Sequence, residues 1–157
     1  VERVDVVSAE DMRQAVMEHI AGADVFIGVA AVADYRPEAA ADSKIKKDAD
    51  RLELKLVRNP DIISEVAALS SRPMVVGFAA ETENLVANGQ AKLKRKHLDL
   101  LFANDATATF NSDSTAVTLI DGEGDEQLPA GSKTAVARLM LERIASRLNT
   151  QRSGVPS

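Results

Sequence analysis

The hydrophobic positions of the chain fall into short, continuous apolar runs separated by longer segments of mixed character. Residues 24–33 and 74–80 are apolar at nearly every position, which is typical of strands buried on both faces of a sheet. Residues 8–22 instead carry an apolar side chain at every fourth position, as one face of a helix does. This alternation of strands and helices predicts an α/β protein.

Local signals mark where the helices begin and end. Ser8 is expected to be an N-cap, because Asp11 follows three residues later. Pro60 at a first helical position and Asp61 in a first turn predict the start of a second helix. A third helix is expected over residues 83–96, where basic side chains collect at the C-terminal end and complement the helix dipole.

The last part of the chain changes pattern. Residues 98–103 predict another buried strand, residues 116–128 a β-hairpin, and residues 133–148 an amphipathic helix. We therefore predict one domain over residues 1–149 and a disordered tail at residues 150–157. The predicted domain is a three-layer, Rossmann-like α/β fold. It has a mostly parallel sheet, helices on both faces and a C-terminal β-hairpin extension.

Composition narrows the class of protein. The 157 residues suffice for one domain, and the absence of cysteine excludes disulfides and thiolate metal sites. A net charge of −5 argues against a nucleic-acid-binding protein. No apolar run approaches the ~20 residues that span a bilayer, so we expect a cytoplasmic protein without a membrane partner. The chain does not begin with methionine, which suggests a piece of a longer protein.

The carboxyl ends of the predicted strands carry most of the candidate chemistry. Residues 30–34, 77–82 and 104–105 lie there, and in open α/β sheets such strand ends line a common ligand crevice. Residues 34–50 have no hydrophobic period, so a loop is expected. Residues 52–56 alternate leucines with charged side chains, as a strand with one face in water does.

Two features of this crevice have plain structural alternatives. Gly77 would let a ligand approach the backbone closely, or it simply fits the packing of a helix against the strand. The helix that begins near Pro60 offers free backbone N–H groups to an anion, although ordinary helices begin in the same way.

The lysines also have two interpretations. Lys44, Lys46 and Lys47 would repel one another unless an anion is bound among them, but a solvated run of charges is the plainer alternative. Lys92 and Lys96 share a helix face, where they would bind an anion or complement the dipole. The sequence contains no Ser-His-Asp set, GxGxxG or Walker motif. These features indicate an anion-binding crevice with no evident nucleophile.

Several segments together resemble a known family. They are residues 30–37 (AAVADYRP), 44–47 (KIKK), 57–62 (VRNPDI), 77–82 (GFAAET) and 99–105 (DLLFAND), with 110–113 (FNSD) after them. In this order they closely resemble bacterial phosphopantothenoylcysteine synthetase, over about residues 4–148. That enzyme is usually the C-terminal half of a bifunctional coenzyme A biosynthesis protein. The N-terminal half is a flavin-dependent decarboxylase, to which FMN would belong.

The resemblance implies a two-step ligation. CTP activates the carboxylate of 4′-phosphopantothenate as an acyl-cytidylate with release of pyrophosphate, and the amine of L-cysteine then displaces CMP. Mg²⁺ assists the first step. The implied partners are these small molecules, a second copy of the chain in a homodimer, and the fused flavin decarboxylase domain.

The nucleotide contacts of the family carry over onto matched positions. Lys44 would be catalytic and reach the phosphates, and Asp34 would contact the nucleotide or its metal ion. The remaining contacts would come from Gly28, Val29, Ala30, Pro60, Asp61, Ile62, Ile63, Phe78, Lys92 and Lys96. Residues 60–63 would read the base through backbone groups. Asn104 and Asp105 are expected near the site on geometry alone.

One departure from the family pattern separates the hypotheses. The synthetase domain normally begins with a glycine-rich strand–turn–helix, and nothing in this sequence matches it. A truncated nucleotide-binding module without turnover is therefore the alternative to a complete ligase. A doubly wound oxidoreductase is disfavoured, because its phosphate-binding fingerprint is missing. The amphipathic pattern around Val117 and Leu119 suggests that the hairpin forms the dimer interface.

Overall fold

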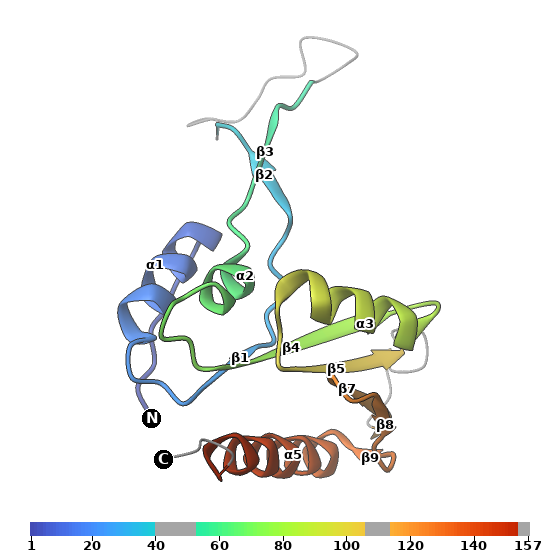
Figure 1. Ribbon diagram of the computed structural model, residues 1–157. Coiled ribbons are helices and arrows are strands. Elements are labelled where there is room, and N and C mark those ends of the chain that lie inside the picture. The colour runs from blue at the N-terminus through green and yellow to red at the C-terminus, as the bar shows by residue number, and fades with distance from the viewer. Residues whose placement is uncertain (40–52, 106–113, 154–157) are drawn as a thin grey trace.

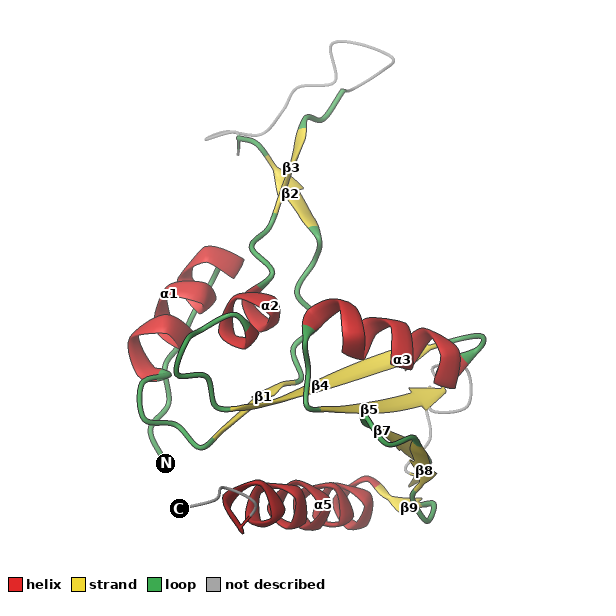
Figure 2. Cartoon of the chain, viewed as in Figure 1, coloured by secondary structure: helices red, strands yellow, loops and turns green. Residues whose placement is uncertain are grey.

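The computed structural model describes residues 1–39, 53–105 and 114–153 (Figure 1). Its elements, coloured by type in Figure 2, are α1 (Ala9–His19), β1 (Val25–Gly28), β2 (Tyr35–Pro37), β3 (Leu56–Arg58), α2 (Ile62–Ala67), β4 (Met74–Glu81), α3 (Leu85–Lys96), β5 (Leu100–Asp105), β6 (Ser114–Thr115), β7 (Val117–Ile120), β8 (Asp125–Gln127), β9 (Gly131–Ser132) and α5 (Lys133–Ser153).

The main sheet has five strands in the order β1-β4-β5-β7-β8. The first three run parallel, so Gly28 lies opposite Gly77 and Gly77 lies opposite Leu101. β7 and β8 form the predicted hairpin, and it joins the sheet antiparallel to β5. The α/β class and the hairpin extension are therefore confirmed.

Helices cover both faces of this sheet. α1, α2 and α3 lie on one side and α5 on the other (Figure 1). Alternation along the central strands explains why both faces need cover: Val75 and Leu101 pack toward α2 and α3, whereas Val76 and Phe102 pack toward α5. The predicted three layers are present.

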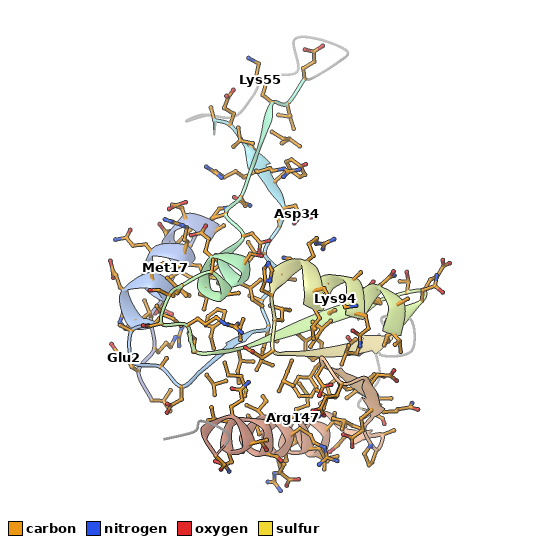
Figure 3. The ribbon with its side chains drawn as sticks, in the orientation of Figure 1. Glu2, Met17, Asp34, Lys55, Lys94 and Arg147 are labelled. Carbon is orange, nitrogen blue, oxygen red and sulfur yellow. The ribbon has the colours of Figure 1, made fainter. Side chains whose placement is uncertain are left out.

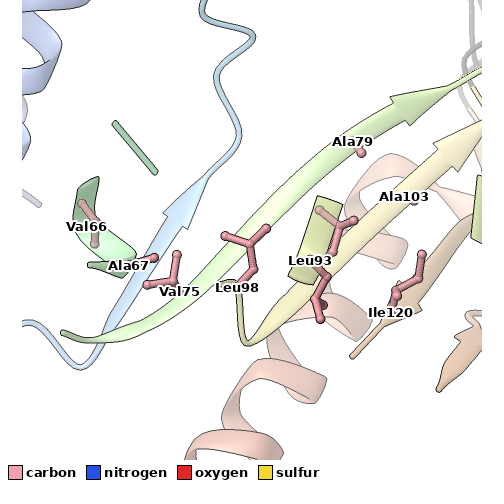
Figure 4. Packing of buried hydrophobic residues seen from close by; sticks show 9 residues of the cluster. Val66, Ala67, Val75, Ala79, Leu93, Leu98, Ala103 and Ile120 are labelled. Atoms are coloured by element: carbon pink, nitrogen blue, oxygen red, sulfur yellow. The ribbon is translucent and has the colours of Figure 1, made fainter. Parts of the chain in front are cut away.

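The face beneath α2 and α3 is an aliphatic core (Figure 4). Val66 of α2 and Leu93 of α3 are buried against Val75 and Ala103 of the sheet. Gly89 lets α3 approach the sheet closely, because an added Cβ would clash with the Cδ1 atom of Ile120. Small residues therefore set the spacing between α3 and the sheet.

The start of α1 follows the predicted capping pattern. The Ser8 hydroxyl accepts a hydrogen bond from the backbone N–H of Asp11 at 3.1 Å, and the Asp11 carboxylate accepts one from the Ser8 N–H at 2.9 Å. This reciprocal pair is a capping box, and it satisfies two N–H groups at the open end of the helix. The N-cap prediction is confirmed.

The strand predicted over residues 24–33 is much shorter than expected and is not buried on both faces. β1 spans four residues and, among the described strands, pairs only with β4. Ile27 is 41% exposed, and Val29 in the segment that follows is 62% exposed. Its continuous apolar run led to the wrong expectation, because β1 is an edge strand of the described sheet.

The chain leaves the sheet after β1 in a ribbon that the sequence did not predict. β2 pairs antiparallel with β3, and the ribbon projects away from the layers (Figure 1). The strand expected at residues 52–56 begins only at Leu56, within β3. β2 was missed because its three residues are all exposed and include Pro37.

The hairpin does not present the expected interface residues. Val117 and Leu119 are only 2% and 3% exposed, because they pack with Val136 and Ile144 of α5. Val117 and Leu119 are therefore not exposed for an interface, and the prediction that the hairpin forms a dimer interface stays a prediction. β7 is an interior strand between β5 and β8, so its apolar alternation serves the core.

The last helix extends further than its pattern predicted. α5 continues to Ser153, so residues 150–153 are helical where a tail was expected, and residues 154–157 lie outside the described part. Within the described ranges, no helix combines the length and apolar character that a bilayer-spanning segment needs.

Candidate functional site

The candidate site lies where the chain leaves β1 and returns into α2. Asp34 lies at the foot of the β2–β3 ribbon (Figure 3), and its side chain is exposed. The turn at Asn59 and Pro60 connects the other strand of the ribbon to α2. Two sequence-predicted segments, residues 30–34 and 60–63, thus border the same part of the molecule.

Asn59 joins these two segments directly. Its side-chain amide Nδ2 donates a hydrogen bond to the carbonyl oxygen of Ala33 at 2.7 Å, and its backbone N–H donates to the carbonyl oxygen of Asp34 at 2.9 Å. Arg36 adds to the junction, because its Nη1 atom donates to the carbonyl oxygen of Arg58 at 2.8 Å and to Asn59 Oδ1 at 3.1 Å.

Sequence reasoning assigned no role to Asn59 or Arg36, although both stand in the segments that carried the resemblance. The available signal was the asparagine immediately before Pro60, which is typical of a turn. That signal indicates local structure but not a contact with Ala33, which lies 26 residues earlier in the chain.

The structure pairs two of the predicted site residues with each other. Lys96 Nζ lies 3.0 Å from the carboxylate of Asp61, which is also the N-cap of α2 and accepts a hydrogen bond from the Ser64 N–H at 3.4 Å. Burial alone would raise the pKa of Asp61. The hydrogen bonds from Lys96 and Ser64 outweigh it and hold the pKa below its ordinary value. Lys92 lies one turn before Lys96 on the same face of α3 and is half-buried.

Two glycines hold α2 close to the sheet. Gly28 and Gly77 are register partners on β1 and β4, and a Cβ added to either would lie within 3.4 Å of the Ile63 Cδ1 atom. At Gly77 the added Cβ would also lie 2.7 Å from Leu98 Cδ1 and 3.0 Å from Leu101 Cδ1. The helix-packing interpretation of Gly77 therefore holds in this structure. The same contacts bring Ile63, one of the predicted base-contacting residues, against the sheet.

The other predicted residues lie at different distances from the Asp61–Lys96 pair. Val29 and Ala30 are exposed in the segment after β1, and Ile62 is buried at the start of α2. Phe78 packs with the cluster on the α5 face, so the structure does not bring its side chain to Asp61 and Lys96 on the opposite face. The predicted contact of Phe78 with a nucleotide stays a prediction.

Three further predictions concern the ends of the strands and the long loop. Asn104 lies at the carboxyl end of β5 opposite Ala80 of β4, three register positions beyond Leu101, and its expected place near the site stays a prediction. Lys44, the predicted catalytic residue, lies outside the described residues, as do Lys46 and Lys47. In sequence they fall between the two strands of the ribbon.

Among the described residues, two cavities lie between the hairpin and α5. Two shallow cavities of about 160 and 190 Å³ share Asp121, Glu123 and Arg147 in their walls, and the larger one reaches Met74 at the start of β4. Arg147 is paired with both carboxylates, at 3.0 Å to Glu123. Because acidic side chains predominate there, these cavities are unsuited to a polyphosphate.

Comparison with known proteins identifies the relatives of this chain. The family model described as DNA/pantothenate metabolism flavoprotein C-terminal domain matches residues 1–148. A protein of Vibrio cholerae called "Coenzyme A biosynthesis bifunctional protein CoaBC" is 46% identical over 150 residues. The protein of the same name from Escherichia coli K12 is 47% identical over 154 residues. The matches cover 92% and 94% of this chain but 38% of each relative, so the chain spans well under half of their length.

Solved structures agree with this family at the level of the fold. A crystal structure of the C-terminal domain of a Coenzyme A biosynthesis bifunctional protein CoaBC superposes with a TM-score of 0.74 at 32% identity, covering 94% of this chain and 68% of that one. The DNA/pantothenate metabolism flavoprotein of Streptococcus pneumoniae also gives a TM-score of 0.74. At 22% identity over 90% of this chain and 71% of that one, it supports the fold alone.

Proposed function

The chain belongs to the family of DNA/pantothenate metabolism flavoprotein C-terminal domains, and from this membership we propose that it acts in coenzyme A biosynthesis. The proposed reaction is the ligation of 4′-phosphopantothenate to L-cysteine at the expense of CTP. Support comes from relatives whose printed name is a coenzyme A biosynthesis bifunctional protein.

The observation that carries the proposal is the junction at Asn59. It ties the segment containing Asp34 to the turn that precedes α2, and Lys96 reaches that turn from α3. Two segments that resemble the synthetase family therefore meet there with the C-terminal end of α3. A carboxylate, a group of backbone amides and a half-buried cation are the groups that a metal-bound nucleotide needs.

The proposed chemistry has two balanced steps. A carboxylate oxygen of 4′-phosphopantothenate attacks the α-phosphorus of CTP, and the bond to the β-phosphate breaks with loss of pyrophosphate. The cysteine amine then attacks the acyl carbon, loses a proton and expels CMP. Such transfers depend on neutralising the phosphate charge and positioning the reactants, and they require no covalent nucleophile from the protein.

The residues present fit a magnesium ion that is shared with a nucleotide. Among the described residues no group of three or more His, Asp or Glu side chains could hold a metal ion. Mg²⁺ commonly binds through one or two carboxylates together with substrate phosphates, and the exposed Asp34 offers one carboxylate. When bound, the ion would supply neutralisation of the phosphate charge.

The protein side chains then have distinct tasks. Lys44 would meet the phosphates, and Lys92 and Lys96 would add positive charge from α3. Backbone groups of residues 60–63 would contact the base, at a depth set by Ile63 against the paired glycines. Because Lys96 is paired with Asp61 in the structure, an incoming phosphate would compete with that carboxylate.

The proposal extends to two partners. A homodimer and a fused FMN-dependent decarboxylase half are proposed from the family resemblance and from the word "bifunctional" in the names of the relatives. Val117 and Leu119 are buried in the core, so they do not supply the contact surface of this dimer.

The test is turnover by the full chain. Purified protein is incubated with Mg-CTP, 4′-phosphopantothenate and cysteine, and CMP and the amide product are quantified by mass spectrometry. The proposal expects one CMP per amide, with acyl-cytidylate accumulating when cysteine is withheld. Binding of CTP without CMP formation would instead favour the alternative, a nucleotide-binding module without turnover.

A further inference from the structure

We propose that Asn59 and Arg36 are positioning residues that hold the Asp34 segment, the turn before α2 and the foot of the ribbon in one fixed arrangement. The inference rests on the proposed function, because the arrangement matters for catalysis only if these segments bind one nucleotide. Neither residue is assigned to contact the substrate itself.

The hydrogen bonds of Asn59 support this role. Its Nδ2 atom donates to Ala33 at 2.7 Å, its Oδ1 atom accepts from Arg36 at 3.1 Å, and its backbone N–H donates to Asp34 at 2.9 Å. Both polar atoms of the side chain are thus engaged, by partners more than 20 residues away in the chain. One half-buried asparagine therefore fixes the backbone on which the Asp34 carboxylate is mounted.

Arg36 extends the arrangement to the ribbon. It lies on β2 opposite Val57 of β3, and its guanidinium reaches past the strand to the carbonyl oxygen of Arg58 and to Asn59. The guanidinium of Arg58 in turn lies 5.9 Å from the ring centroid of Tyr35. The foot of the ribbon is consequently fastened to the residue that holds Asp34.

The hydrogen bonds of Asn59 and Arg36 lie near the surface, so their loss should affect the local geometry more than the stability of the fold. Arg36 is exposed and Asn59 only half-buried, so water can replace much of what their hydrogen bonds contribute to folding. The bonds do, however, determine how the two segments sit relative to each other. A loss of either side chain should therefore change ligand binding more than it changes the stability of the fold.

The chain offers a control on the other face of the sheet. Arg143 of α5 donates from its Nε and Nη2 atoms to the carboxylate of Glu126 on β8, at 3.1 and 2.6 Å. It thus joins two elements through an arginine side chain, as Arg36 does. Neither α5 nor β8 carries a proposed site residue.

The experiment compares N59D, R36A, N59D/R36A and R143A in the full chain. N59D keeps the shape and an acceptor for Arg36, but it replaces the donor to Ala33 with an oxygen that repels that carbonyl. The dissociation constant of Mg-CTP is expected to rise about tenfold in N59D and in R36A. The double variant should bind Mg-CTP at most slightly more weakly than either single variant, because both residues act through one arrangement. R143A should bind Mg-CTP as the wild type does.

Steady-state kinetics add the KM values for CTP and cysteine, which would not change if the two residues only stabilised the fold. Both site variants should raise KM for CTP and leave KM for cysteine unchanged, whereas a fall in the folded fraction would lower the rate and leave both values unchanged. Wild-type KM for CTP in N59D, or fully additive effects in the double variant, would overturn the inference.

Hydrogen exchange separates failure of the inference from failure of the proposed function. If the wild-type chain binds no CTP, the proposed function fails, and the arrangement is judged by amide exchange alone. Faster exchange over residues 30–34 and 59–63 in N59D, but not in R143A, would support the positioning role. Unchanged exchange in N59D would overturn it.

Discussion

The centre of the sheet and the edge at β1 are held together by different forces. Around β4, β5 and β7 the chain is closed on both faces by apolar side chains, and Phe102 and Leu101 are fully buried. At β1, the ribbon and α2, hydrogen bonds between exposed or half-buried groups join segments that are distant in sequence. The centre therefore supplies most of the stability, and the edge supplies a geometry to which a ligand can bind.

The largest expected effect belongs to the centre. Phe102→Ala removes a fully buried ring beneath α5 and should lower the free energy of unfolding by about 3–5 kcal/mol. Urea denaturation of the full chain measures this change. A loss below about 1 kcal/mol would contradict the view that the centre dominates stability.

A smaller effect is expected where the two regions meet. Gly77→Ala places a Cβ 2.7 Å from Leu98 and 3.0 Å from Leu101, so overpacking should cost about 1–3 kcal/mol. Gly122→Ala is the matched control, because an added Cβ there meets nothing within 4 Å. If both variants unfold at the same urea concentration, close packing at Gly77 is not what the site requires.

At the edge, a substitution is expected to change the affinity for Mg-CTP more than the stability of the fold. Lys96→Gln should weaken Mg-CTP binding about tenfold, since it removes a cation that would face the phosphates. It should change the unfolding free energy by less than about 1 kcal/mol, because the pair with Asp61 is partly exposed. Lys94→Gln, on the exposed face of the same helix, serves as the control in calorimetry. Equal affinities in the two variants would remove Lys96 from the site.

The smallest effect is a pH dependence at Asp61. Because folding lowers the pKa of this carboxyl, its contribution to stability is present above the unfolded value and is lost as the pH falls through the folded one. The difference in unfolding free energy between wild type and Asp61→Asn should thus have its full size at about pH 6, where it should be less than about 1 kcal/mol. It should decrease as the pH falls below the ordinary pKa of 3.8. In a Lys96→Gln background it should shrink at every pH. A difference that grows on acidification would contradict this assignment.

The same contrast explains what the sequence could predict. The buried strands β4 and β5 and the capping box at Ser8 were predicted because continuous apolar runs and short-range capping patterns are local signals. The family resemblance is confirmed by the match over residues 1–148. These features depend on residues that are close together in the chain.

The edge region could not be predicted in the same way. The contact of Lys96 with Asp61 spans 35 residues, and that of Asn59 with Ala33 spans 26. Polar contacts at such separations leave no period in the sequence, so only the folded chain reveals them. Burial of an apolar run is also decided only by the folded chain. The run after Asp24 was assigned to a buried strand, although the structure leaves Ile27 and Val29 exposed.

The most direct test of the central claim is a calorimetric titration of the full chain with Mg-CTP and then with Mg-ATP. If the edge at Asp34, Asn59 and Lys96 is a cytidine-nucleotide site, Mg-CTP should bind at one site per chain and Mg-ATP should bind more weakly. Absence of binding, or equal affinity for both nucleotides, would contradict the account.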